Sequence, residues 1–582
     1  MLEINATDMC GIVGVKKEGE ASEKAFESLK RLEYRGYDSA GIATADSSIE
    51  VVKGTGTIDE AVNKESFGES AIGHTRWATH GGVNEVNAHP HTDCNGSIAV
   101  AHNGIINNYK ELKSSLSGVG HRFESETDTE VIPHLIEEYF EGGASRREAC
   151  ERVMEDLEGS FAVTVLFESG DIVAFRKSSP LVIGVGEGEH FVASDFTAFL
   201  EHTERALFLE DGDLAVLNSN LEVYSDGEKV DREVKEIDWD SGDATKAGHD
   251  HYMTKEIREQ KNTIKRAAFQ DRSDMREAVS MLDDADNIYM TACGTASYAA
   301  EIGAKYLREA GYEPHVEKAH ELEHRADKIS GDDIVVAVSQ SGETADLLSV
   351  LEETDADVLS VVNVVGSTLA RNSEKALYVN AGPEIAVAST KAFTAQITVL
   401  KLLAHSASDK LDRGRKELIE TAEKVSDVLK SNQQTIESVA GYLKDKQDVY
   451  FIGRNLGREL AYESALKLKE LSYLHAEGFP GGEFKHGTLA LIEEGIPVFC
   501  FLNHDRSDLI SNAMEAESRG ADLIGVGDEP TEDLKYFFKI PEDPNSEILE
   551  IVPMQMLAYR TAVKRGNDPD KPRNLAKSVT VK

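Results

Sequence analysis

Short apolar runs alternate with amphipathic stretches in the N-terminal part of the chain. Runs such as SIAVAHNGII and GSFAVTVLF are rich in β-branched residues and are typical of strands, whereas the stretches between them have helical periodicity. This mixture predicts an α+β or layered α/β domain over residues 10–225. Residues 226–250 are polar and charged with few apolar positions, which predicts a linker.

The rest of the chain repeats strand, polar loop and helix in two similar halves. NIYMTAC and DIVVAVS precede helical stretches in the first half, and DVYFIG and IPVFCF do so in the second. Strands that alternate with helices of this length predict parallel sheets with crossover helices. We therefore expect two doubly wound α/β lobes, over residues 251–425 and 426–572, and an ordered C-terminal tail over residues 573–582.

The charge balance narrows the possible partners. The 582 residues include 62 Lys and Arg against 105 Asp and Glu, a formal net charge of −43. Such a surface argues against nucleic acid and anionic membranes as binding partners, because both are bound through basic residues. No apolar run approaches the length of a membrane span. Acidic residues are spread along the whole chain, which favours a surface adapted to high salt over an ordinary acidic cytosolic protein.

The cysteines are widely spaced, with no CxxC pair. They are Cys10, Cys94, Cys150, Cys293 and Cys500. This spacing indicates neither a zinc site nor a disulfide framework, and it favours a cytoplasmic protein.

Cys10 opens the first predicted strand, CGIVG. A cysteine at a mature N-terminus can pass its thiol proton to its own α-amine, whose pKa is about 8. Residues 1–9 have neither the basic nor the apolar part of a signal peptide. We expect them to be an extension, a misassigned start before Met9, or a removed leader. The alternative for Cys10 is a buried structural cysteine.

Six segments between residues 10 and 130 carry a family resemblance: CGIVGV, LEYRGYDSAGIA, GHTRWATHG, NAHPH, HNGIINN and ESETDTE. Together they resemble the class II glutamine amidotransferases, which are N-terminal-nucleophile enzymes with an α/β/β/α sandwich. The resemblance implies that Cys10 is the nucleophile and that Asn103 and Gly104 form the oxyanion hole. It also implies that Trp77 gates ammonia passage. The residues implied in glutamine binding are Arg76, Thr79, His80 and Asp128.

Several histidines of this region suggest a metal site as an alternative. They are His74, His80, His89 and His91. No carboxylate or cysteine lies beside them at ligand spacing, and the resemblance implies no metal, so we expect none. We interpret His102 as a hydrogen-bonded structural histidine.

The segment Ser339–Thr344, SQSGET, lies between a predicted strand and a predicted helix. Its hydroxyls, its backbone N–H groups and a helix N-terminus suit a phosphate dianion without any lysine. The alternative is a simple helix cap. The longer segment SQSGETADLL resembles the signature of the sugar isomerase (SIS) family.

Further segments extend the resemblance to essentially the whole chain: EIAVASTKAFTAQ, YESALKLKELSYLHAEGFPGGEFKHGTLAL and RNLAKSVTV. They resemble the family of isomerizing glutamine–fructose-6-phosphate transaminases. The resemblance implies that L-glutamine and fructose 6-phosphate are the substrates, that glucosamine 6-phosphate is the product, that no cofactor is used and that the protein is a homodimer. The residues implied in sugar-phosphate binding are Ser297, Ser339, Gln340, Ser341, Thr344, Val387, Ser389 and Lys467.

The resemblance also implies roles in the sugar chemistry. Lys577 forms a Schiff base with the ketose, Glu470 moves a proton between C1 and C2, and His486 assists ring opening from a neighbouring subunit. Lys467 lies one helical turn before Glu470, so the two share a face. The loop that carries Ser297 reads CGTASY, one residue longer than is usual in the family. The phosphate-binding hydroxyl of this loop is therefore either that of Ser297 after a local shift or absent.

Three other functions compete with this interpretation. An amidophosphoribosyltransferase shares the glutaminase half, but no strand is followed by the two adjacent acids and Thr-rich loop of a phosphoribosyltransferase. A non-catalytic sugar-phosphate sensor would lack residues such as Cys10, Glu470 and Lys577. A different glutamine-dependent or deaminating sugar-phosphate isomerase of the same family remains an alternative.

Overall fold

The computed structural model describes residues 10–579 apart from 18, 20, 34, 35, 37, 63–67, 78–80 and 238–245. The expected leader or extension over residues 1–9 lies outside the described residues, as do Thr79 and His80. The chain divides into two compact units. Unit 1 comprises Met1–Ala244 with Ala576–Lys582, and unit 2 comprises Thr245–Leu575.

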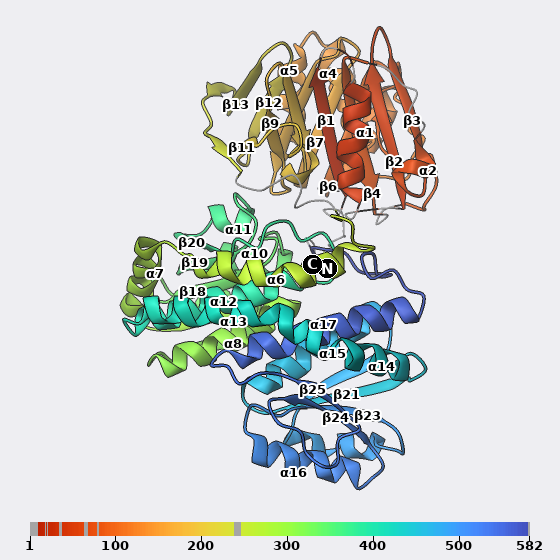
Figure 1. Cartoon of the computed structure of the whole chain (residues 1–582). Helices are drawn as coiled ribbons and strands as arrows, with labels where there is room; N and C mark the ends of the chain where they lie inside the picture. The colour runs from red at the N-terminus through yellow and green to blue at the C-terminus, as the bar shows by residue number, and fades with distance from the viewer. Residues whose placement is uncertain are drawn as a thin grey trace. The chain divides into compact units, whose positions relative to one another are not determined.

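Unit 1 contains two antiparallel sheets (Figure 1). The first has the order β15 (Val234–Glu236), β11 (Arg205–Phe208), β9 (Val182–Val185), β10 (Glu189–Ala193), β1 (Gly11–Lys17), β4 (Ser70–Arg76), β2 (Ser39–Ala45) and β3 (Ile49–Thr55). The second has the order β14 (Glu228–Val230), β13 (Leu221–Ser225), β12 (Asp213–Leu217), β8 (Ile172–Lys177), β7 (Gly159–Phe167), β6 (Ile98–Ile106) and β5 (His91–Thr92).

Helices cover the outer faces of these sheets. Helix α1 (Ala21–Arg31) packs on β1 and β4, and the short α2 (Ile58–Ala61) follows β3. The second sheet is covered by α3 (Tyr109–Val119), α4 (Val131–Glu141) and α5 (Arg146–Asp156). Apolar residues of both sheets, among them Ile12, Ile72 and Ala101, form one core between them. The expected α/β/β/α sandwich is therefore confirmed.

The predicted linker over residues 226–250 contains regular structure in its first part. Strands β14 and β15 both fall within this range. Each is polar and largely exposed, because it adds to the edge of a sheet whose apolar residues lie elsewhere. An edge strand held by backbone hydrogen bonds needs no apolar alternation, so the hydropathy pattern did not reveal it.

Unit 2 contains two parallel sheets with the same topology. Their strands are, in sheet order, β17 (His315–Lys318), β16 (Ile288–Ala292), β18 (Ile334–Ser339), β19 (Asp357–Val362) and β20 (Lys375–Tyr378), and then β22 (His475–Pro480), β21 (Asp448–Gly453), β23 (Pro497–Phe501), β24 (Asp522–Gly527) and β25 (Tyr536–Lys539). Within each sheet the order is second, first, third, fourth, fifth, so the expected doubly wound lobes are confirmed.

The helices of unit 2 pack around both sheets and between them. They are α6 (Tyr252–Ala268), α7 (Arg272–Asp284), α8 (Gly294–Glu309), α9 (Ala319–Leu322), α10 (Ala345–Glu353), α11 (Thr368–Arg371), α12 (Lys391–Ala407), α13 (Leu411–Ser431), α14 (Gln433–Leu443), α15 (Leu456–Ser472), α16 (Arg506–Glu517) and α17 (Ser546–Lys564). One continuous core joins the two lobes, in which α15 packs against α8 and α17. Within the described part of the chain, no helix is both long and apolar enough to cross a membrane.

Candidate active sites

Cys10 lies directly before β1, and its side chain is buried beside a small cavity. The backbone N–H of Trp77 donates a hydrogen bond to Cys10 Sγ at 3.2 Å. Strand β1 pairs with β4, which ends at Arg76, so the sheet register brings the thiol to the segment GHTRW. An N–H donor aimed at the sulfur stabilises a thiolate, which is the form in which cysteine acts as a nucleophile.

Asn103 is oriented toward Cys10 by a buried histidine. Its Nδ2 donates to the carbonyl oxygen of Cys10 at 2.7 Å. His74 Nε2 lies 3.0 Å from both Asn103 Oδ1 and the carbonyl oxygen of His102. Because both are acceptors, Nε2 carries the proton, and its hydrogen bond fixes which end of the Asn103 amide faces Cys10. Burial lowers the pKa of His74 to about 3, so this histidine is neutral at physiological pH.

The cavity beside Cys10 is lined by Gly104, Arg76 and Asp128 among others. Gly104 has a φ of +114°, and an added Cβ would lie 2.0 Å from the carbonyl oxygen of Ser160, so only glycine fits there. Burial lowers the pKa of the Arg76 guanidinium, while the charges of Cys10 and Asp128 act in the opposite direction. The cavity therefore offers a cation and an anion near the thiol, as the two charged groups of an amino acid require.

Three histidines of this region form a row of ring contacts, in which His74 stacks on His89 and His89 meets His91 edge to face. The rings of His74 and His89 lie 4.2 Å apart, and those of His89 and His91 lie 4.8 Å apart. His91 Nε2 lies 3.1 Å from Thr127 Oγ1, next to Asp128. The row of histidine rings thus connects the two sides of the cavity.

The SQSGET segment forms a tight turn between β18 and α10. Ser339 Oγ accepts a hydrogen bond from Gly342 N–H at 2.9 Å, and Thr344 is the N-cap of α10. Gly342 has a φ of +71°, and a Cβ there would lie 2.2 Å from Ser367 Oγ. The turn follows β18, the third strand of this sheet in sequence, which lies beside the first strand, β16. In doubly wound sheets, ligands bind where the strand order reverses in this way, at the carboxyl ends of the strands. Gln340 and Ser341, in the middle of the turn, are half-buried.

Helix α15 carries a buried charge cluster on one face. Lys467 Nζ lies 2.6 Å from Glu470 Oε2 and 3.6 Å from Glu463 Oε1. Burial raises the pKa of Glu463 to about 8, and the charge of Lys467 offsets only part of this rise. Glu470 keeps part of its side chain exposed, so it is the member of the cluster that a ligand can reach.

A third carboxylate, that of Glu384, approaches this cluster from the loop before α12. Glu384 is buried, accepts a hydrogen bond from Ser389 Oγ at 3.0 Å, and helps to raise the pKa of Lys467. In the same loop, Val387 N–H donates to the carbonyl oxygen of Asp570 at 3.2 Å. Sequence reasoning missed both Glu384 and Glu463. A signal for Glu463 was available in the sequence, because Glu463, Lys467 and Glu470 are spaced i, i+4 and i+7 and so share one face of a helix.

The segment that precedes the last residues is anchored beside α15. Asn567 Nδ2 donates to the carbonyl oxygen of Leu471 at 3.0 Å, and Arg573 N–H donates to Tyr473 Oη at 2.8 Å. The Asp570 carboxylate accepts the first two backbone N–H groups of α6, each at 2.9 Å. These contacts hold residues 567–573 against the end of α15, the helix that carries Lys467 and Glu470, and against the start of α6.

Two predicted site residues, Ser297 and His486, are not brought into these clusters, and a third, Lys577, is assigned to the other unit. Ser297 lies in the first turn of α8 and donates its hydroxyl proton to the carbonyl oxygen of Gly294 at 2.6 Å. His486 is exposed in the turn Glu483–His486, and within the described residues it makes neither a hydrogen bond nor an ion pair. Lys577 belongs to unit 1, whereas Glu470 belongs to unit 2.

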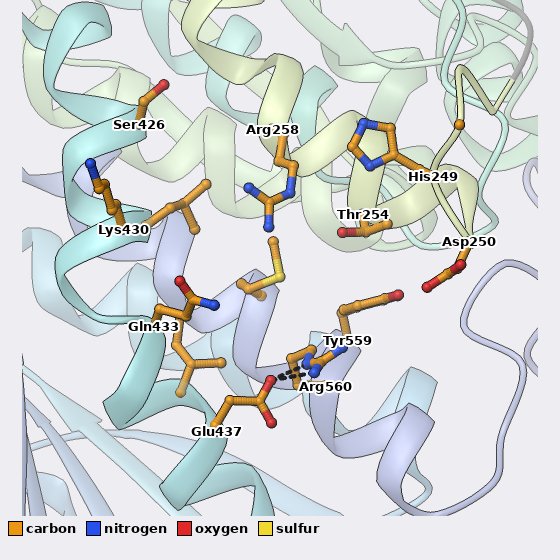
Figure 2. Close-up of a pocket in the computed structure, with 14 residues that line it drawn as sticks. His249, Asp250, Thr254, Arg258, Ser426, Lys430, Gln433, Glu437, Tyr559 and Arg560 are labelled. Atoms are coloured by element: carbon orange, nitrogen blue, oxygen red, sulfur yellow. Dashed lines mark hydrogen bonds and ion pairs between the residues drawn. The ribbon is translucent and has the colours of Figure 1, made fainter.

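Unit 2 also contains a larger cavity of about 550 Å³ between α6, α13, α14 and α17. Figure 2 shows that Arg258 points toward it, and that Arg560 is paired with Glu437. None of the residues predicted for the active site lines this cavity.

Comparison with known proteins matches both halves of the chain. The family model of the glutamine amidotransferase domain matches residues 74–201, and that of the SIS domain matches residues 281–406 and 442–565. The chain is similar to a solved structure, the C-terminal domain of glucosamine-fructose-6-phosphate aminotransferase from Francisella tularensis. The similarity covers 56% of this chain and all of that chain, with 31% sequence identity and a TM-score of 0.53.

Two curated relatives are similar over nearly the whole chain. The glutamine–fructose-6-phosphate aminotransferase [isomerizing] of Thermococcus kodakarensis is 45% identical over 98% of this chain and all of its own length. The protein of the same name from Clostridium perfringens is 42% identical over the same shares. The chain therefore belongs to the family of isomerizing glutamine–fructose-6-phosphate aminotransferases.

Proposed function

We propose that the protein converts fructose 6-phosphate and L-glutamine into glucosamine 6-phosphate and L-glutamate, the first step of hexosamine and UDP-N-acetylglucosamine synthesis. One observation carries the proposal. The chain combines a buried thiol, that of Cys10, whose backbone carbonyl accepts a hydrogen bond from the oriented Asn103 amide, with a Lys467–Glu470 pair that lies in a sugar isomerase fold. The first pair suits amide hydrolysis, and the second suits proton transfer on a sugar.

In the glutaminase half, Cys10 Sγ attacks the side-chain amide of glutamine. We propose that the α-amine of Cys10, once it is N-terminal, takes the thiol proton. Asn103 Nδ2 and Gly104 N–H stabilise the oxyanion, which collapses to a thioester and releases ammonia. Water then hydrolyses the thioester to glutamate. Arg76, Thr79, His80 and Asp128 hold the amino-acid part of glutamine, and Trp77 gates the passage of ammonia.

In the isomerase half, Lys577 forms an imine with the C2 carbonyl of the open-chain ketose, and ammonia replaces the lysine at C2. Glu470 then removes a proton from C1 and returns it to C2, which leaves an aldehyde at C1 and an amine at C2. Lys467, at 2.6 Å, holds the Glu470 carboxylate in place. His486 of a neighbouring subunit assists ring opening. The phosphate and sugar are held by Ser297, Ser339, Gln340, Ser341, Thr344, Val387 and Ser389.

Paired assays of glutamate release and aminosugar formation test this division of labour. Cys10→Ala is expected to abolish glutamate release yet keep some aminosugar formation from high ammonium. Glu470→Gln is expected to abolish aminosugar formation from either nitrogen source while glutamate release persists. Loss of both reactions in each folded variant would contradict two separable sites.

The same proposal extends to the state of the protein. The family resemblance supports a homodimer, since His486 is exposed in this chain and would act on a partner's sugar. The net charge of −43 supports a surface adapted to a salty cytoplasm. A functional division at residues 10–225, 251–425, 426–572 and 573–582 remains part of this proposal.

A further inference from the structure

Four side chains with metal-binding atoms converge in unit 1, away from the Cys10 cavity. Cys94 lies in the turn between β5 and β6, His121 follows the end of α3, and His134 and Glu137 share one face of α4. One ligand atom from each, Sγ, Nδ1 or a carboxylate oxygen, lies within 4.8 Å of the others. We call these four residues the Cys94 cluster.

The distances within the Cys94 cluster fit a tetrahedral ion. Cys94 Sγ lies 3.6 Å from Nδ1 of His121 and 3.6 Å from Nδ1 of His134. Glu137 Oε2 lies 3.0 Å from His121 Nδ1 and 3.4 Å from His134 Nδ1. Zinc bonds of about 2.0–2.3 Å at tetrahedral angles place ligand atoms roughly 3.3–3.8 Å apart. The side chains need only small adjustments to reach this geometry.

The surroundings resemble the supporting shell of a metal site. His121 Nε2, on the far side of the ring, lies 3.1 Å from a Glu138 carboxylate oxygen. The other oxygen of Glu137 accepts a hydrogen bond from Asn95 Nδ2 at 2.8 Å. In metal sites, a ligating histidine usually donates its other ring N–H to a carboxylate, and a ligating carboxylate usually accepts a further hydrogen bond. Both kinds of contact orient the ligands.

Within the Cys94 cluster a thiol, a carboxylate and two imidazole rings bring their metal-binding atoms together. A thiolate beside a carboxylate is an unfavourable pair unless a cation neutralises them. A divalent cation would satisfy the thiolate, the carboxylate and both imidazoles together.

We propose that Cys94, His121, His134 and Glu137 bind one divalent transition-metal ion of the zinc class as a structural site. Four protein ligands leave no open position, so the ion would not take part in catalysis. The ion would connect the turn before β6 to α4. Strand β6 carries Asn103, and α4 follows the segment that carries Asp128. This differs from the expectation of no metal, because the ligands come from separate elements and form no recognisable sequence spacing.

Metal analysis of the full chain, purified without a metal-affinity tag, tests the proposal. The protein is stripped with chelator, equilibrated with zinc and freed of unbound metal. One zinc per chain is expected, and less than about a tenth of that in Cys94→Ser and His134→Ala. Cys10→Ala and Cys293→Ser are matched thiol controls that should retain the full zinc content. Wild-type protein without stoichiometric zinc, or Cys94→Ser with unchanged zinc, would overturn the proposal.

Cobalt substitution tests the ligands without relying on a variant that folds. Cobalt(II) bound at the Cys94 cluster should give the intense d–d absorption of a tetrahedral ion and a thiolate-to-cobalt charge-transfer band. Both should persist in Cys10→Ala. An octahedral spectrum without the thiolate band would show that the cluster is only a set of hydrogen bonds between the four side chains.

Discussion

Asn103 Nδ2 donates a hydrogen bond to the carbonyl oxygen of Cys10 at 2.7 Å, which ties the proposed oxyanion donor to the backbone of the proposed nucleophile. The two residues are 93 positions apart and come from different sheets. Because His74 fixes the Asn103 amide, the donor is in place before glutamine binds. Such pre-arranged donors stabilise a transition state without reorganisation during the reaction.

Asn103→Ala is therefore expected to lower kcat for glutamine hydrolysis by about 10²–10³-fold, the usual cost of removing one oxyanion donor. The KM for glutamine should change little, because Arg76 and Asp128 are untouched. Initial-rate measurements of glutamate release provide the check. Asn218→Ala, in the exposed turn between β12 and β13, is the matched control and should behave as wild type. A raised KM with normal kcat would mean that Asn103 only binds substrate.

Glu463 should make stability depend on pH in an unusual direction. Burial raises its pKa from the ordinary 4.5 to about 8, so the folded state keeps a proton that the unfolded chain has released. Between these values the folded protein binds more protons, and stability falls as pH rises, by at most about 1.4 kcal/mol per pH unit for this group. Its contribution is fully present below pH 4.5 and is lost as pH rises through 8.

Denaturant unfolding of the wild type and Glu463→Gln at pH 6, 7 and 8 measures this effect. The variant should lose less stability over this range, because glutamine cannot ionise. Equal slopes for both proteins would show that Glu463 is ionised throughout, paired with Lys467.

The Asp570 contacts predict that the tail can be uncoupled from the lobes. Asp570→Ala removes two hydrogen bonds to the start of α6 and costs about 0.5–2 kcal/mol, too little to unfold unit 2. Aminosugar formation should fall at least tenfold while glutamate release continues, because the segment before Lys577 loses its anchor. Lys577→Ala, and deletion of residues 573–582, should abolish aminosugar formation but leave basal glutamate release.

Parallel assays of both products, with and without fructose 6-phosphate, provide the measurement. Asp533→Ala is the control: it removes an exposed aspartate outside the segment that leads to Lys577, so both activities should stay as in the wild type. Full-rate synthesis by Lys577→Ala would exclude this lysine as the imine-forming residue, and loss of glutaminase activity would give the tail a structural role.

The net charge of −43 predicts salt-dependent stability. Repulsion among surface carboxylates is weakly screened at low ionic strength, so the compact state should be destabilised there. The melting temperature and the activity should both rise as potassium chloride is increased from millimolar to molar concentrations. Unchanged values across this range would remove the support for salt adaptation.

The sequence predicted the sheets and loops better than the side-chain clusters. Apolar runs such as IVVAVS predicted β18, and SQSGET after it predicted the turn, because both signals are local. The exposed edge strands β14 and β15 were missed because backbone pairing alone holds them. The Cys94 cluster and Glu384 were missed because their partners come from elements far apart in sequence, which periodicity cannot show.

Transfer of the amide nitrogen within one protein is the central claim, and isotope labelling measures it directly. The wild-type protein is supplied with fructose 6-phosphate, glutamine labelled with ¹⁵N at the amide, and excess unlabelled ammonium. Mass spectrometry of the product should show glucosamine 6-phosphate that carries nearly all of its nitrogen as ¹⁵N. Product that contains mainly unlabelled nitrogen, or glutamate release without any aminosugar, would contradict the account.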